Sequence, residues 1–340
     1  MFKLLLKLIN RITAYVAHVN LLCCLLSLGN AANLDEMSRK TGKSTTQIIN
    51  EVIHRQYAKE ARTMDLAHHG TVITFATIKG GTAKTTSVTA FADVLARQGK
   101  HILVIDAVPR GRLAILLGLT SEGSYKNTLK ALINDRLTAN SEHLDIRTFL
   151  HPATQTSSRI DIIPSDSRLN DAFTRINETV FARAALFRNI IEEIRALDKY
   201  DYIIFDTSSE LHREVAPVLI ATDHVIIPIE PSVDAISGAK MTMKFMEKFL
   251  PLNANLQLLG IFMTKTNKRY KSFRQTFPQS QKTFDKHMFH TLLPIRQDAV
   301  NAANRHVPVT KKCPRNKLSQ KYEELVAEAI SRIEGQDTSC

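Results

Sequence analysis

Residues 79–86 bring together the chemical groups that hold a phosphate. The segment consists of Lys79, Gly80, Gly81, Thr82, Ala83, Lys84, Thr85 and Thr86. A glycine-rich turn between a strand and a helix lets backbone N–H groups approach an anion, and the dipole of the helix adds to the attraction. In such a loop Lys84 would contact the β- and γ-phosphates and the Thr85 hydroxyl would ligate Mg²⁺. The alternative is a glycine-rich turn without a ligand, but two glycines followed by Lys-Thr-Thr favour a phosphate site.

The elements around this loop predict a parallel sheet. Residues 71–78 are rich in β-branched side chains and lead into the loop, and a helix with one apolar face follows it and ends before Gly99. Further strands are expected at residues 101–106, 160–163, 202–205, 224–229 and 258–263. Helical patterns separate most of these runs. The sequence therefore predicts an α/β fold with a doubly wound, mainly parallel sheet and helices on both faces.

Five segments then follow one another in an order that a known family shares. They are residues 79–86, 160–165, 202–207, 224–232 and 293–296, the last followed by Ala302 and Pro308. Together they resemble the ParA/MinD family of dimeric P-loop ATPases over about residues 71–330, and most closely its partition proteins. Lys-Gly-Gly-x-x-Lys-Thr-Thr is similar to the family's deviant Walker A motif, whose early lysine corresponds to Lys79.

The resemblance implies an Mg·ATP site and a homodimer closed by ATP. In the family the early lysine, here Lys79, reaches across the dimer to the partner's nucleotide phosphates. The implied catalytic residues are Lys79, Lys84 and Asp106, and the implied Mg²⁺ ligands are Thr85, Asp106 and Asp206. Asp206 lies in the segment 202–207, which resembles the Walker B strand. The nucleotide-binding set is residues 79–86 with Asp206.

Three departures from the family pattern predict weak hydrolysis. Ala83 stands where the family has glycine, so its methyl group crowds the phosphates or opposes a positive φ angle. Val108 replaces the acid that positions the attacking water, and a valine neither orients nor deprotonates water. Asp206 is followed by Thr-Ser-Ser where the family has x-Pro-Pro, which alters the adjoining loop. Losing a water-orienting group slows turnover by about two to four decades, so we expect nucleotide binding with slow turnover.

The composition favours a polyanionic partner. Of 340 residues, 45 are Lys or Arg and 33 are Asp or Glu, a net charge of +12, while 44% hydrophobic residues exclude a disordered chain. Residues 265–312 hold eleven basic residues against two acidic ones, which predicts non-specific DNA binding through the C-terminal third. These basic residues are Lys265, Lys268, Arg269, Lys271, Arg274, Lys282, Lys286, Arg296, Arg305, Lys311 and Lys312. Lys240, Lys244 and Lys248 lie four apart, and a solvated helix face explains them more simply.

The chain before the loop divides into two short zones. Residues 1–33 are apolar and basic, and residues 12–28 form an apolar run at the lower limit for spanning a bilayer. The interpretations are an interfacial anchor, a marginal span, a signal-like segment and a stretch upstream of the true start. We favour the last, or a loosely packed helix, over a membrane role. Residues 34–65 resemble the two helices of a ribbon-helix-helix DNA-binding module, and an amphipathic helical hairpin is the simpler interpretation.

The sequence thus predicts an ATPase-like domain over residues 71–335 and a function in DNA partition. ATP would close a homodimer, the dimer would bind DNA, and a ParB-like partner would stimulate turnover in the cytoplasm, on the nucleoid. A second interpretation is a regulator that binds nucleotide and DNA without hydrolysis, for example an autorepressor. A third is a MinD-like membrane-associated ATPase. It ranks last because the family's membrane-targeting helix is C-terminal, and residues 318–333 carry many charges here.

Overall fold

The structure is a computed structural model. It describes residues 70–109, 111–119, 126–138, 142–154, 156–176, 180–209, 215–312 and 314–335, together with Arg39 and Gly42, but not the side chains of residues 180–185. The chain divides into two compact units, Met1–Met64 and Asp65–Cys340. In the first unit Arg39 is helical and Gly42 has a φ of +67°. The predictions for residues 1–33 and 34–65 otherwise lie outside the described residues.

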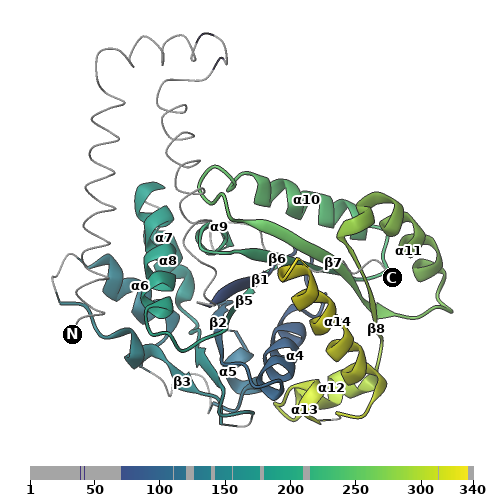
Figure 1. The fold of residues 1–340 in the computed structure, drawn as a ribbon, viewed down its shortest axis with the longest axis horizontal. Coiled ribbons are helices and arrows are strands. Elements are labelled where there is room, and N and C mark those ends of the chain that lie inside the picture. Colours follow the sequence, from purple (N-terminus) through teal and green to yellow (C-terminus); the bar gives the residue numbers. More distant parts are fainter. Residues whose placement is uncertain are drawn as a thin grey trace. The chain divides into compact units, whose positions relative to one another are not determined.

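Eight strands form one sheet in the part of the chain that the structure describes, in the order β3-β4-β2-β5-β1-β6-β7-β8 (Figure 1). All neighbours pair in parallel except β3 and β4. The strands are β1 (Thr71–Phe75), β2 (Ile102–Ala107), β3 (His151–Pro152), β4 (Ile160–Ile163), β5 (Tyr202–Thr207), β6 (His224–Ile229), β7 (Gln257–Thr266) and β8 (Met288–Pro294). The predicted doubly wound α/β fold is confirmed.

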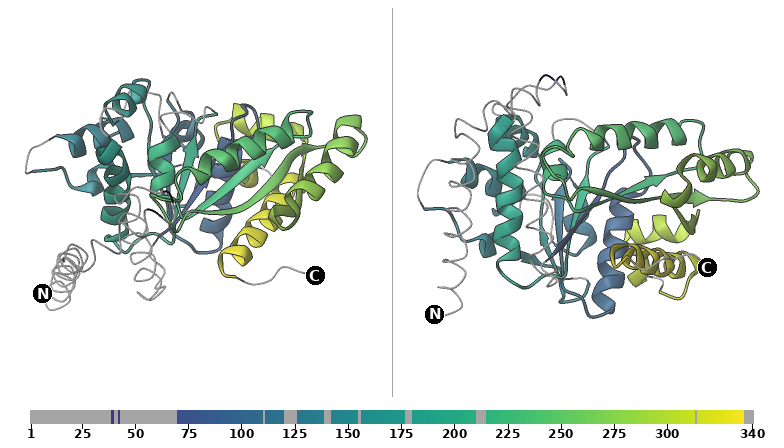
Figure 2. Two further views of the ribbon diagram at one scale, coloured as in Figure 1. Left: turned by 90° about the horizontal axis from the view of Figure 1, so that it is seen from above. Right: turned by 45° about the horizontal axis from the view of Figure 1, so that its top comes forward.

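Helices cover both faces of this sheet (Figures 1 and 2). One face carries α4 (Lys84–Arg97), α5 (Leu113–Leu116), α12 (Gln297–Asn304), α13 (Val309–Lys312) and α14 (Lys317–Ile333). The other carries α6 (Leu129–Leu137), α7 (Leu169–Ile176), α8 (Val180–Arg195), α9 (Val215–Ile220), α10 (Ala235–Glu247) and α11 (Lys271–Phe284). Two 3₁₀ turns, Ile146–Phe149 and Asp285–His287, complete the described elements.

The alternation of side chains along the strands builds two cores. Ile73 and Phe75 of β1 face the layer of α4, whereas Val72 faces the layer of α8. The ring of Phe75 packs edge-on against Phe91 of α4, with centroids 5.0 Å apart, and against Phe262 of β7 at 6.4 Å. These contacts fix the helix after the glycine loop against the strand before it.

Strand positions mostly follow the sequence prediction. Residues 160–163 and 224–229 coincide with β4 and β6, and the strand expected at residues 71–78 ends earlier, at Phe75. The sequence interpretation did not include β8 or the two-residue β3. Among the described helices, none is long and apolar enough to cross a membrane.

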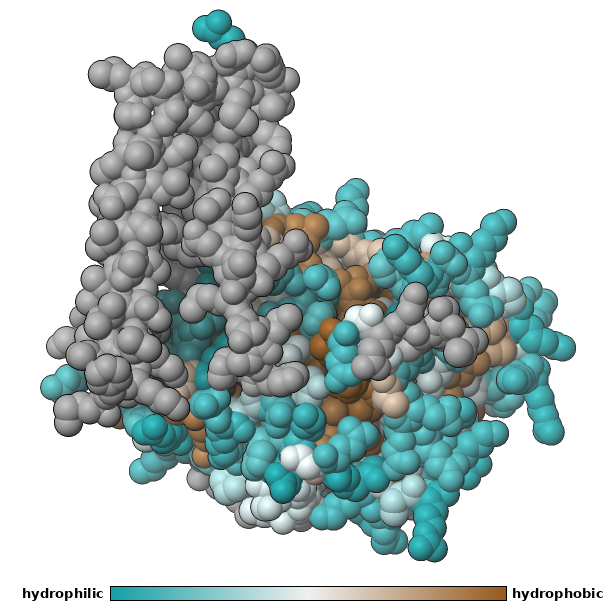
Figure 3. Space-filling view, viewed as in Figure 1, coloured by the Kyte–Doolittle hydropathy of each residue, from teal (hydrophilic) through white to brown (hydrophobic). Residues whose placement is uncertain are grey.

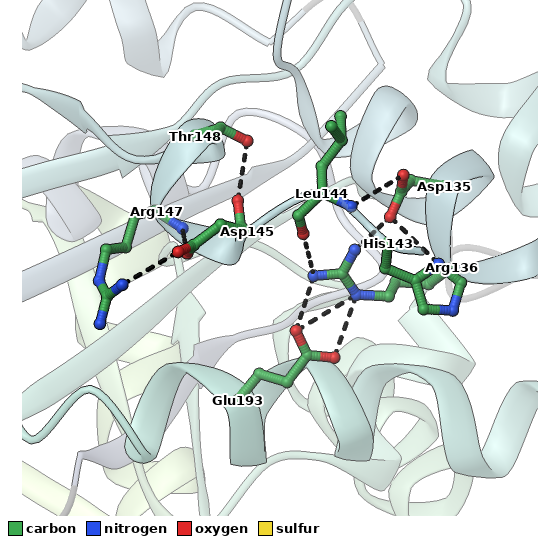
Figure 4. A network of polar contacts seen from close by, with 8 residues as sticks. All are labelled: Asp135, Arg136, His143, Leu144, Asp145, Arg147, Thr148 and Glu193. Atoms are coloured by element: carbon green, nitrogen blue, oxygen red, sulfur yellow. Dashed lines mark hydrogen bonds and ion pairs between the residues drawn. The ribbon is translucent and has the colours of Figure 1, made fainter. Parts of the chain in front are cut away.

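Among the coloured residues in Figure 3 most are hydrophilic, and hydrophobic ones gather in a band down the middle of the face. A network of polar contacts fastens α6 to α8 (Figure 4). The Arg136 guanidinium donates to both carboxylate oxygens of Glu193, at 3.0 Å and 2.6 Å, and to the carbonyl of Leu144 at 3.1 Å. Arg136 also pairs with Asp135, its neighbour on α6. This network positions the helices and lies outside the site described next.

Candidate nucleotide-binding site

The glycine loop connects β1 to α4, as the sequence predicted. Gly81 has a φ of +77°, and Ala83 directly precedes the helix with φ 63° and ψ 30°. The Ala83 carbonyl accepts the first helical hydrogen bond, from the Ser87 N–H at 2.9 Å. Ala83 thus takes the left-handed conformation at its usual cost for an L-residue, about 1–2 kcal/mol.

Lys84 is buried at the bottom of the loop. Its side chain is 7% exposed, and its Nζ donates to Ser209 Oγ at 2.9 Å. Burial lowers the pKa of Lys84 to about 8, against the opposing charge of Asp206. Ser209 lies in the segment after β5 that departs from the family pattern. The serine found there therefore accepts a hydrogen bond from the loop lysine.

Thr85 and Asp206 meet beside the loop. The Thr85 hydroxyl donates to Asp206 Oδ2 at 2.6 Å. Asp206 Oδ1 is buried and has no hydrogen-bond partner among the described residues. Burial raises the pKa of Asp206 to about 6, although Thr85 and Lys84 oppose the shift. A hydroxyl and an unpaired carboxylate oxygen fit Mg²⁺, which prefers oxygen ligands and takes few from the protein when it is bound with phosphates.

Asp106 lies beside Asp206, but the backbone around it encloses its carboxylate. The two residues are register partners on β2 and β5. Asp106 Oδ1 accepts from the Val108 N–H at 3.1 Å and Oδ2 from the Leu113 N–H at 3.3 Å. The chain at Gly111 passes so close that a Cβ there would overlap the carboxylate. Burial and the charge of Asp206 raise the pKa of Asp106. Its roles as metal ligand and catalytic residue stay predictions.

A cavity of about 680 Å³ opens over the loop. Its lining includes residues 81–86, Val108 and residues 293–296, the last of the five segments that carry the family resemblance. Val108 therefore reaches the cavity with an apolar side chain. Leu318 and Tyr322 of α14 also line it. Their spacing of four residues on an amphipathic helix was visible in the sequence, but only the fold brings that helix to the loop.

The Lys79 ammonium contacts residues that follow β6 and does not line the cavity over its own loop. Its Nζ donates to Ser232 Oγ at 2.8 Å and lies 3.2 Å from Glu230 Oε1, and Lys79 is not among the residues that line the cavity. A second lysine, Lys265, reaches the other oxygen of Glu230 at 3.3 Å. Lys265 and its neighbour Thr264 line the cavity, and the sequence interpretation placed neither there.

The basic residues of the C-terminal third lie mostly at the surface. Lys268 and Arg269 precede α11, Lys271 begins it, and all three are exposed. Lys240 and Lys244 lie exposed on α10 and Lys248 follows its end, as a solvated helix face predicts. The structure thus brings Lys84, Thr85 and Asp206 together and places Lys79 and Lys265 beside them on Glu230. Lys268, Arg269 and Lys271 do not line the cavity.

A glycine loop between the first strand and its helix, with aspartates ending β2 and β5, defines a P-loop nucleotide-binding protein. Residues 70–258 match the family model described as AAA domain. The chain belongs to this family, within its ParA/MinD group of P-loop ATPases. Its relatives include the chromosome partitioning protein ParA of Caulobacter vibrioides, 26% identical over 264 residues that make up 77% of this chain and 94% of the relative.

Two solved structures share the fold. Apo McdA of Cyanothece superposes with a TM-score of 0.65 at 21% identity, covering 77% of this chain and all of the other. Cobyrinic acid a,c-diamide synthase of Mycobacterium smegmatis, with a bound ATP analog and magnesium, gives a TM-score of 0.65 at 19% identity. It covers 79% of this chain and 97% of the synthase chain.

Proposed function

We propose that the protein is an Mg·ATP-dependent switch of the ParA type, acting in DNA partition. The observation that carries the proposal is the contact set at the loop, where Lys84 lies buried under the cavity and Thr85 donates to Asp206. Lys84 would bind phosphate oxygens, and Thr85 with Asp206 would hold Mg²⁺. When bound, the ion neutralises charge on the phosphates. The relative named for chromosome partitioning and the synthase structure with its ATP analog support this assignment.

Slow turnover follows from Val108. Phosphoryl transfer depends mostly on positioning and charge neutralisation, and one group usually orients the attacking nucleophile. Val108 lines the cavity without a polar group, and the Asp106 carboxylate is engaged by two backbone N–H groups. Neither side chain is placed to orient a water, so the bound state would be long-lived.

Dimerisation would use Lys79. Since its ammonium lies outside its own cavity, on Glu230 and Ser232, it is positioned at the surface beside the loop. The family role of this lysine, on the nucleotide of a second copy, requires such a position. The dimer would bind DNA non-specifically through the basic residues around α11, in the cytoplasm and on the nucleoid, with a ParB-like partner that stimulates turnover.

Light scattering with and without Mg·ATP tests this proposal on the wild type, Lys79→Ala and the control Lys317→Ala. Lys317 is exposed at the start of α14 and serves as a matched surface lysine. We expect ATP to double the mass of the wild type and the control but not of Lys79→Ala, and calorimetry to detect ATP binding by all three. No nucleotide binding by folded wild type would refute the proposal.

A regulator without hydrolysis is the second candidate, and Val108 in the cavity wall favours it. The two functions differ in turnover. Release of phosphate that DNA and a partner protein accelerate supports the partition switch, whereas ATP that binds and is never hydrolysed supports the regulator.

A further inference from the structure

Lys265 occupies an unusual place at the end of β7. The residues on either side of it, Thr264 and Thr266, are buried, whereas the Lys265 side chain is partly exposed and lines the cavity over the loop. Its backbone has a φ of +52°, in the left-handed region. Such strain costs about 1–3 kcal/mol and persists where the surrounding structure fixes it, often at functional sites.

The neighbouring strand end fixes this geometry. The Thr266 hydroxyl donates to the Leu293 carbonyl at 3.1 Å, and the Ile295 N–H donates to the Thr266 carbonyl at 3.1 Å. Leu293 and Ile295 belong to the cavity wall. Lys265 is therefore held between the glycine loop and the late segment, not in a free surface turn.

The ammonium of Lys265 reaches the glycine loop. A Cβ built on Gly81 would lie 3.8 Å from Lys265 Nζ, so the ammonium lies next to the glycine loop. Its ion-pair partner is Glu230, which also holds Lys79. One carboxylate thus sits between two ammonium groups beside the phosphate-binding turn. A surface pair of this kind is weak, about 0–1 kcal/mol, so a stronger anion displaces it readily.

Two features of the cavity itself point to an anionic ligand near Lys265. Among the described residues, the charged ones that line it are Lys84, Lys265 and Arg296, all cationic. Thr264, only 2% exposed, also lines the cavity, and its hydroxyl has no hydrogen-bond partner among the described residues. A buried hydroxyl without a partner is costly, and a ligand oxygen would satisfy it.

We propose that Lys265 is a phosphate-binding residue of the nucleotide site, acting within its own subunit. The phosphate chain draws the ammonium from Glu230 into the cavity, where it joins Lys84. The inference rests on the proposed nucleotide site and adds to it a cation that the loop motif does not include. It also separates Lys265 from the DNA-binding lysines with which the sequence grouped it.

Calorimetric titration with Mg·ATP tests the proposal on the wild type, Lys265→Met and the control Lys317→Met. Methionine is one atom shorter than lysine but keeps an unbranched side chain and the Cβ, so the backbone strain is unchanged. Lys317 is exposed and does not line the cavity. We expect Lys265→Met to bind ATP about 10-fold more weakly or worse, the size of one hydrogen bond to a charged group. Lys317→Met should match the wild type.

Thermal unfolding separates a binding role from a structural one. Without nucleotide, Lys265→Met should keep the wild-type Tm, because it loses only an exposed ion pair, while the rise in Tm on adding Mg·ATP should shrink. Wild-type ATP affinity in Lys265→Met, or weaker binding together with a fall in the nucleotide-free Tm, would overturn the inference and leave the proposed function standing. Folded wild type that binds no Mg·ATP would overturn both.

Discussion

Replacing Ala83 by glycine should stabilise the protein and strengthen nucleotide binding. Ala83 holds φ 63° and ψ 30°, which costs an L-residue about 1–2 kcal/mol and glycine almost nothing. Glycine also gives the unfolded chain more conformational freedom, which offsets about 0.4–1 kcal/mol of this gain in stability. The net gain is about 0.5–1 kcal/mol, and for a domain of this size that raises the Tm by about 1–3 °C.

His306→Gly is the matched control. His306 also has a positive φ, 55°, and is exposed after α12 without lining the cavity. Both variants should raise the Tm in differential scanning calorimetry. Only Ala83→Gly should also increase the affinity for Mg·ATP, because only Ala83 places a methyl group in the phosphate-binding turn. The reasoning fails if His306→Gly raises the Tm and Ala83→Gly does not, since strain at Ala83 is then absent or needed for the fold.

Three further changes test other parts of the molecule. Val108→Asp should raise ATP turnover by about 100-fold, the lower end of general-base effects, in a phosphate-release assay; an unchanged rate would show that Val108 does not limit hydrolysis. Changing Lys268, Arg269 and Lys271 to glutamate should weaken binding to all DNA sequences equally and lower the salt slope by about one unit per residue in filter binding. A loss confined to one sequence would contradict non-specific contact. Arg136→Met should cost about 2 kcal/mol in denaturant unfolding, since it leaves a half-exposed carboxylate without its buried partner, and should not change nucleotide affinity.

The sequence predicts the central strands well because both faces of a parallel sheet are covered. Such strands are continuous apolar runs, and residues 160–163 and 224–229 match β4 and β6. β8 is an edge strand that includes His290 and Thr291, so its pattern is mixed. Glu328 of α14 accepts hydrogen bonds from the backbone N–H groups of both residues. These hydrogen bonds satisfy two backbone N–H groups of the edge strand. Because Glu328 lies 37 residues after Thr291, no local sequence pattern predicts the contact.

The residues of the candidate site divide in the same way: some belong to one local motif, and others come together only in the fold. Lys84 and Thr85 belong to one motif, so their types and spacing predict the loop. Lys265 stands in a run of basic residues, and composition assigns it to a charged surface. Its place beside Gly81 depends on the order β1-β6-β7 and on a positive φ that lysine seldom adopts. Neither the strand order nor this backbone angle can be inferred from the residues next to Lys265 in the sequence.

The two aspartates show why residue type alone does not settle a role. Asp106 and Asp206 are register partners near the ends of adjacent strands, and the family resemblance assigns both to Mg²⁺. Asp106 has both oxygens engaged by its own loop, whereas Asp206 keeps one oxygen without a partner beside the Thr85 hydroxyl. The proposed phosphate and metal ligands therefore meet at Asp206, and Val108 stands where the resemblance places a water-orienting acid. The proposed switch rests on this division: nucleotide affinity would depend on Lys84, Thr85 and Asp206, whereas turnover would depend on position 108, so that the bound state would outlast that of a fast ATPase.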